Sequence, residues 1–171
     1  MIYLIGSLKN PTIPLISNQL RAEGFEVFSE WFSPGPRTDW YWMQYEKGRG
    51  HGITEALKGY HARHVFEFDL RHLNRATVGV LVLPAGRSGH LELGYLMGQG
   101  KKGYILFDKE PKKYDVMYGF AEAVCFSVQD LIGELGHLAL GPVGKMVSGT
   151  ESRGSSTQTI GERAAKTIMR G

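Results

Sequence analysis

Two carboxylates, Glu92 and Asp69, have sequence surroundings that suit chemistry on a bound ligand. Glu92 lies in the stretch LPAGRSGHLELGY (83–95), in which an apolar run passes through a glycine-containing loop into a helical pattern. We predict that Ser88 caps this helix and that Glu92 lies in about its first turn, where the helix dipole favours an ionised carboxylate. Such a group can attack or stabilise the anomeric carbon of a sugar. A purely stabilising role at the helix start is the alternative.

Asp69 is the second carboxylate. It follows the segment 65–68, which we predict to be extended, and it is a plausible N-cap for a short helix over 70–76. Because parallel strands gather their carboxyl ends at one edge of a sheet, Asp69 and Glu92 are expected to face the same crevice. Two carboxylates in one crevice can divide the roles of acid and nucleophile. Helix capping alone is the alternative for Asp69.

Two small turns are predicted at the same edge of the sheet. Gly6-Ser7 ends the first apolar run, where glycine allows close approach of a ligand and serine offers a hydroxyl and an N–H to a ribose or phosphate. Ser88-Gly89 offers a similar sugar or phosphate cradle, or only a helix cap. Neither turn belongs to a GxGxxG or Walker-type phosphate loop.

An unusually aromatic segment, residues 29–52, follows the second predicted strand. It contains all three tryptophans of the chain, at positions 31, 40 and 42, together with Tyr41, Tyr45 and Asp39. A long segment of this kind between regular elements is typical of a lid or binding loop, and aromatic faces suit stacking on a planar base. Trp31 and Asp39 are the candidate ligand contacts. The alternative is a hydrophobic cap over the sheet end.

The elements that must position these residues follow an alternating pattern. A strand, a helix and a strand within the first 28 residues form a βαβ unit, which implies a parallel sheet. The five apolar runs interleaved with helices predict a doubly wound α/β domain. The predicted strands are 2–5, 25–28, 78–83, 104–107 and 123–126, and the predicted helices are 10–23, 53–64, 70–76, 91–99, 116–122 and 127–138.

Length and charge distribution limit the classes of function. The 171 residues suit one domain, which we place at 1–140. Residues 1–144 hold 15 basic and 15 acidic residues, so the net charge of +3 belongs to the tail. The folded part therefore has no basic excess for binding nucleic acid. The tail, 141–171, is rich in Gly, Ser and Thr, and we predict that it is mostly disordered, with a short helix over 162–169.

The remaining composition predicts a cytoplasmic protein without a metal site. Cys125 is the only cysteine, which excludes a disulfide framework and favours a buried structural thiol. The six histidines show no metal-binding spacing. No apolar run approaches the roughly 20 residues needed to cross a membrane, and the N-terminus lacks the features of a signal peptide.

Four motifs together resemble the nucleoside 2-deoxyribosyltransferase superfamily, which includes the 2'-deoxynucleoside 5'-monophosphate N-glycosidases. They are YLIGS (3–7), FD (68–69), SGHLELGY (88–95) and GQGK (98–101). The resemblance covers about residues 1–138, and its most specific part is the Glu92–Tyr95 segment. It implies a flavodoxin-like five-stranded parallel sheet, no cofactor, a small nucleoside or nucleotide substrate and a homodimer or larger homo-oligomer.

The resemblance also implies roles for individual residues. Glu92 matches the nucleophile that forms a glycosyl-enzyme ester, and Asp69 matches the acidic residue that orients it or protonates the leaving base. Tyr3 and the turn at Gly6-Ser7 match sugar-side positions. One departure is Gly86, where many transferases of the superfamily have an aspartate that contacts the base; Arg87 and Ser88 beside it suit an anionic substrate.

The sequence leaves three functions open. The first is cleavage or exchange of the N-glycosidic bond of a nucleoside or 2'-deoxynucleoside, or of its 5'-monophosphate, with the sugar and the base unassigned. The second is a non-catalytic nucleotide-binding module, in which Glu92 only accepts hydrogen bonds from ribose hydroxyls. The third is an NAD-type glycohydrolase. The choice between transferase and hydrolase also stays open.

Overall fold

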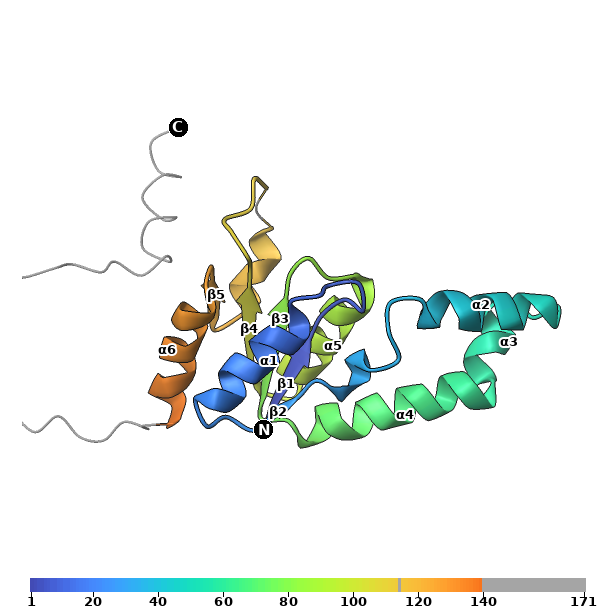
Figure 1. The fold of residues 1–171 in the computed structure, drawn as a ribbon, viewed down its shortest axis with the longest axis horizontal. Coiled ribbons are helices and arrows are strands. Elements are labelled where there is room, and N and C mark those ends of the chain that lie inside the picture. Colours follow the sequence, from blue (N-terminus) through green and yellow to red (C-terminus); the bar gives the residue numbers. More distant parts are fainter. Residues whose placement is uncertain (114, 140–171) are drawn as a thin grey trace, which may run out of the picture. The chain divides into compact units, whose positions relative to one another are not determined.

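The computed structural model describes residues 1–113 and 115–139. Its five strands form one parallel sheet in the order β2-β1-β3-β4-β5 (Figure 1). This confirms the predicted doubly wound α/β fold. The predictions for the tail, disorder and a short helix, lie outside the described residues. The strands are β1 (Ile2–Ile5), β2 (Val27–Phe28), β3 (Val78–Val82), β4 (Lys102–Leu106) and β5 (Ala123–Cys125).

Alternation along the central strands produces two apolar cores. In β1, Ile2 and Leu4 point to one face of the sheet, where they pack with α1 (Ile13–Ala22) and α6 (Val128–Ala139). Tyr3 and Ile5 point to the other face and pack with α5 (Arg87–Gly98) and the end of α4 (Tyr60–Arg75). All four residues are buried, and so is Cys125, as predicted.

Helix α5 packs over two positions of the sheet, in β3 and β4, that are glycines. A Cβ atom added at Gly79 would lie 3.0 Å from Leu96 Cδ1, and one added at Gly103 would lie 3.0 Å from Leu93 Cδ1. Contacts this short leave no room for a side chain. The helix that carries Glu92 is therefore held firmly against β3 and β4.

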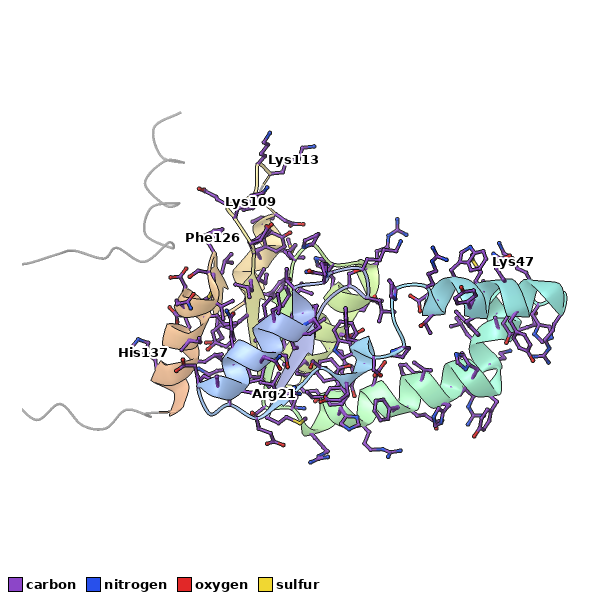
Figure 2. All side chains as sticks on the ribbon, in the orientation of Figure 1. Arg21, Lys47, Lys109, Lys113, Phe126 and His137 are labelled. Carbon is purple, nitrogen blue, oxygen red and sulfur yellow. The ribbon has the colours of Figure 1, made fainter. Side chains whose placement is uncertain are left out.

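The second part of the fold is an arm made of α2 (Thr38–Gly48), α3 (Ile53–Lys58) and α4, which extends beyond the sheet (Figure 1). A short 3₁₀ turn, η1 (Glu30–Phe32), leads into it. The labelled Lys47 on α2 lies toward the end of the arm far from the sheet (Figure 2).

The turn between α2 and α3 is built around a buried carboxylate. Glu46 is 3% exposed, and its Oε2 lies 2.6 Å from His51 Nδ1 and 3.7 Å from Arg49 Nη1. The backbone N–H of His51 also donates to the carbonyl of Glu46 at 3.0 Å. Burial of a charge requires such partners, so these contacts stabilise the tip of the arm.

Two predictions around the carboxylates are wrong in their local structure. Residues 65–68 are not extended, and Asp69 is not an N-cap: both lie inside α4. The valine and phenylalanines at these positions favour strands, but such propensity is weak and yields to the helical context on both sides. The predicted helix 53–64 is divided at Gly59, where α3 ends and α4 begins.

The helix after β3 begins earlier than predicted. It starts at Arg87 with Gly86 at the N-cap, so Ser88 lies inside the helix and does not cap it. Glu92 consequently lies in the second turn, and the helix dipole is a poor explanation for an acid at that position. The segment 29–52 is also not one irregular loop, since it contains η1 and α2.

The remaining helices are close to their predicted places. The prediction over 116–122 corresponds to a 3₁₀ helix, η2 (Val116–Phe120). The helix predicted over 127–138 is α6, and Ser127 caps it: its Oγ accepts a hydrogen bond from the N–H of Asp130 at 3.0 Å. Within the described residues, no helix combines the length and the apolar character needed to span a membrane.

Candidate functional site

A cavity of about 550 Å³ lies at the carboxyl ends of β1 and β3. These two strands lie side by side, but the chain leaves them in opposite directions across the sheet, which makes this the point where ligands bind in open α/β folds. Of the residues singled out from the sequence, nine line this cavity: Tyr3, Gly6, Ser7, Trp31, Asp39, Asp69, Gly86, Ser88 and Glu92.

Arg87 and Gly89, by contrast, are not among the residues that line it. Arg87 is exposed outside the cavity. Gly89 is buried, and a Cβ added there would lie 3.0 Å from Leu81 Cδ1 and 3.1 Å from Ile5 Cγ2. Gly89 therefore allows the first turn of α5 to pack on β1 and β3.

Glu92 enters the cavity from α5 and is largely shielded from water. Burial and, to a smaller extent, the negative charge of Asp69 together raise the pKa of its carboxyl from 4.5 to about 7. Tyr3 lines the same cavity and is 1% exposed, and burial together with the charges of Glu92 and Asp69 raises the pKa of its phenol. Its hydroxyl therefore stays protonated and can donate a hydrogen bond toward an ionised carboxylate.

Asp69 reaches the cavity from the opposite side, on α4. Burial raises the pKa of its carboxyl to about 6, although nearby His72 has the opposite effect. One of its oxygens, Oδ1, is buried without a hydrogen-bond partner among the described residues. A buried acceptor without a partner costs about 1–3 kcal/mol, and a proton or a donor group on a ligand would remove that cost.

The two carboxyl groups therefore titrate as an interacting pair. Because the charge of Asp69 raises the pKa of Glu92, the second proton leaves only near neutral pH. In the state with one proton, the lower pKa of Asp69 leaves the proton mostly on Glu92 in the empty cavity. The tautomer with the proton on Asp69 has an ionised Glu92, able to act as a nucleophile, beside a neutral acid. This is the division of labour that substitution at a sugar carbon requires.

Trp31 closes the cavity over the end of β1. Its indole Nε1 donates a hydrogen bond of 2.6 Å to the carbonyl of Leu4, which fixes the ring at the strand end. Asp39 lies in the first turn of α2, and Trp40 and Met43 of the same helix also line the cavity. The arm thus supplies a partly aromatic wall that suits a planar heterocycle.

Several cavity residues were missed by the sequence analysis, Lys9 and Val65 among them. Lys9 follows Gly6 by three residues, and its backbone N–H donates to Ser7 Oγ at 3.2 Å. A cation so close to the predicted Gly6-Ser7 turn was a usable signal. Val65 lies four residues before Asp69 on the same face of α4. This relation could not be seen from the sequence analysis, because residues 65–68 were predicted to be extended and not helical.

The described residues contain no group of three or more His, Cys, Asp or Glu side chains that could hold a metal ion. Three acidic side chains, Glu92, Asp69 and Asp39, line the cavity, and the polar groups at the ends of β1 and β3 lie beside them.

Comparison with known proteins supports the fold. No protein-family model matches the chain, and no curated protein matches it. A solved structure of the 2-deoxyribosyltransferase from the psychrotolerant bacterium Bacillus psychrosaccharolyticus is similar, with a TM-score of 0.54 and 19% sequence identity over 76% of this chain and 88% of that chain. That enzyme is described as a suitable biocatalyst for the synthesis of antiviral and antitumoral nucleosides. At this identity the similarity establishes the shared flavodoxin-like fold.

Proposed function

We propose that this protein cleaves or exchanges the N-glycosidic bond of a 2'-deoxynucleoside or its 5'-monophosphate. The observation that carries the proposal is the pair of partly buried carboxyl groups, Glu92 on α5 and Asp69 on α4, that line one cavity and whose pKa values are both raised by burial. The similarity in fold to a 2-deoxyribosyltransferase is consistent with it.

In the proposed reaction, a carboxylate oxygen of Glu92 attacks C1' of the sugar. The bond from C1' to the base nitrogen breaks, its electron pair goes to the base, and Asp69 delivers a proton to the departing base. Glu92 is left as a glycosyl ester. Either water or the ring N–H of a second base then attacks C1', Asp69 accepts the proton that the attacking atom loses, and the bond from C1' to the ester oxygen breaks to free Glu92 as a carboxylate.

The polar groups at the ends of β1 and β3 complete the proposed site. Gly6, Ser7, Gly86 and Ser88 form a rim of small residues beside the carboxylates, where a sugar can approach the backbone. Lys9 lines both this cavity and the neighbouring depression at Pro84. We propose that its ammonium group binds the 5'-phosphate of a monophosphate substrate.

The proposed function is tested by chromatography after incubation with a panel of nucleosides and nucleotides, with and without a second free base. Base exchange identifies a transferase, and base release without exchange identifies a hydrolase. Release of nicotinamide from NAD would instead support the glycohydrolase alternative. Binding without any release would support the non-catalytic alternative. Glu92→Gln must abolish turnover and the ester adduct seen by mass spectrometry; unchanged turnover in this variant refutes the mechanism.

We also propose that the protein is a homodimer or larger homo-oligomer. Large apolar side chains are exposed near the cavity on α4 and α5, including Phe66 at 63% and Leu91 at 75%. Apolar surface of this kind is typical of contact sites. Light scattering coupled to size-exclusion chromatography tests this, and Leu91→Glu should shift the protein toward the monomer; a monomeric wild type would rule the proposal out.

A further inference from the structure

The last turn of α4 is held by a lysine from outside the helix. Because α4 ends at Arg75, the carbonyls of Leu73 and Asn74 lack the N–H partners that a longer helix would provide. The N–H of Thr77 instead donates to the carbonyl of Met1 at 3.1 Å. The ammonium group of Lys101 donates to both free carbonyls, at 3.1 Å to Leu73 and 2.7 Å to Asn74. A cation at this position also suits the helix dipole.

The side chain of Asn74 is held from the same direction. Its Oδ1 accepts a hydrogen bond from the Tyr95 hydroxyl at 2.9 Å and another from Gln99 Nε2 at 3.0 Å. Tyr95 lies in α5, and Gln99 is the residue that caps it. Four hydrogen bonds thus join the end of α4 to α5 and the residues just beyond it. We call Asn74, Tyr95, Gln99 and Lys101 the clamp.

The clamp lies between the two elements that carry the candidate catalytic carboxylates. Glu92 precedes Tyr95 by three residues in α5, and Asp69 precedes Asn74 by five residues in α4. Neither Tyr95 nor Lys101 lines the cavity, so neither can touch a ligand there. Both belong to the sequence motifs at 88–95 and 98–101, and a role in binding or chemistry does not account for them.

Little else fixes the direction of α4. Leu73 is the only buried residue of this helix, all of which lies in the described part of the chain. One turn away from Asp69, the ring of His72 stacks on Phe28 with 3.9 Å between ring centroids. The rest of the helix extends into the arm, away from the sheet (Figure 1). A small change of angle at the last turn would therefore move Asp69 relative to Glu92.

We propose that the clamp sets the separation of Asp69 and Glu92, and that Lys101 and Tyr95 are positioning residues for the reaction. This rests on the proposed function, in which both carboxyl groups act on one sugar carbon. Misplacement of a catalytic group by about 1 Å can cost roughly 100-fold in rate. We expect a partial effect, because packing of Leu73 and stacking of His72 remain when the clamp is weakened.

The test compares two adjacent lysines. Lys101→Met removes two bonds of the clamp, whereas Lys102→Met removes only a surface ion pair with Glu122 of 3.4 Å. We expect Lys101→Met to lower kcat about 10-fold with a smaller change in KM, and Lys102→Met to match wild type. Lys101→Arg, which can still donate to both carbonyls, should restore most of the loss.

A titration distinguishes positioning from a general loss of stability. The charge of Asp69 raises the pKa of Glu92, and His72 lowers the pKa of Asp69. The charges of both carboxylates raise the pKa of Tyr3. If Asp69 moves away, the carboxyl-carbon NMR titration of Glu92 shifts to lower pH. Loss of the positive charge of Lys101 would on its own shift it to higher pH. A downward shift therefore reports movement of Asp69.

Tyr95→Phe provides a second variant that removes one hydroxyl and no charge. We expect it to lower kcat about threefold, because one hydrogen bond of the clamp is lost and the others remain. It should shift the Glu92 titration in the same direction. A lower melting temperature with wild-type kcat and an unchanged Glu92 titration would overturn the proposal. The titration requires no turnover, so it tests the clamp even if no substrate is cleaved.

Discussion

The two walls of the cavity are built in different ways. Glu92 comes from α5, which is pressed against β3 and β4 at two glycines, and the small residues around it follow central strands. Asp69, Trp40 and Met43 come from the arm, whose helices bury few side chains. One wall thus holds the proposed nucleophile firmly, whereas the other presents the proposed acid and an aromatic surface on helices that bury few side chains.

The difference suggests a division between chemistry and recognition. Attack at a sugar carbon is the same for every substrate, and it benefits from a rigid nucleophile. The base differs between substrates, and the wall that faces it is the one with fewer packing constraints. Substitutions on the two walls should therefore differ in the size and in the kind of their effects.

The largest effect is expected on the rigid wall. Glu92→Gln should reduce turnover by at least about 10⁴-fold, as expected for loss of a nucleophile.

The Glu92→Gln substitution should also stabilise the folded protein. Since the folded state raises the pKa of Glu92 from 4.5 to about 7, the wild type loses up to about 3 kcal/mol of unfolding free energy as pH rises through this interval. Because the Gln side chain does not ionise, the variant does not lose this unfolding free energy as pH rises. Thermal unfolding at pH 5 and pH 8 measures this, and equal melting temperatures of variant and wild type at pH 8 would contradict it.

Asp69→Asn should have the next largest effect. Loss of a general acid typically costs 10²–10⁴-fold in kcat. In the wild type, kcat/KM should pass through a maximum between about pH 6 and about pH 7, because the reactive pair holds one proton. In the variant only Glu92 of the pair titrates, so kcat/KM should rise to a plateau, and the rise should lie below pH 7 because Asn has no charge to oppose ionisation of Glu92. A pH profile of kcat/KM checks both points; a maximum that persists in the variant would contradict the role of Asp69 as the acid.

A smaller and selective effect is expected at the rim of the cavity. Lys9→Met should raise KM for a 5'-monophosphate about 10-fold, because one charge-assisted hydrogen bond contributes about 1.5–3 kcal/mol. The KM for the corresponding nucleoside should hardly change. Lys47→Met is a matched control, since Lys47 lies toward the far end of the arm (Figure 2). Equal changes for both substrates would exclude phosphate recognition by Lys9.

The smallest effect on activity should come from the tip of the arm. His51→Gln removes the ion-pair partner 2.6 Å from the buried Glu46 carboxylate. We expect faster hydrogen exchange of the α2 and α3 amides, with protection of β1 and β3 unchanged, because the arm can open locally while the sheet stays folded. Equal acceleration in the strands would mean that the two regions unfold as one unit.

The sheet and its edge were predictable because their signals are local. The residues of β1 and β3 form continuous apolar runs. Parallel strands place their carboxyl ends at the same edge of the sheet, and this does not depend on the structure of the loops. The groups around Gly6, Ser7, Gly86 and Ser88 could therefore be placed at one edge from the sequence alone.

The arm was not predictable in the same way. Residues 65–68 favour a strand by composition, and only the helices on both sides of them explain why they join α4. Asp69 was expected in the right cavity for a wrong reason, since it reaches the cavity from a helix and not from a strand end. The contributions of Trp40, Met43 and Val65 depend on how α4 and α2 meet, which no short pattern encodes.

The positions of two tryptophans provide an intrinsic fluorescence signal for ligand binding. Trp31 and Trp40 both line the cavity, and the N–H of Trp31 is fixed to Leu4 at 2.6 Å. A base stacked on these rings would quench their fluorescence. In the Glu92→Gln variant, emission could then be titrated against each candidate base or nucleotide to rank affinities without any bond being broken.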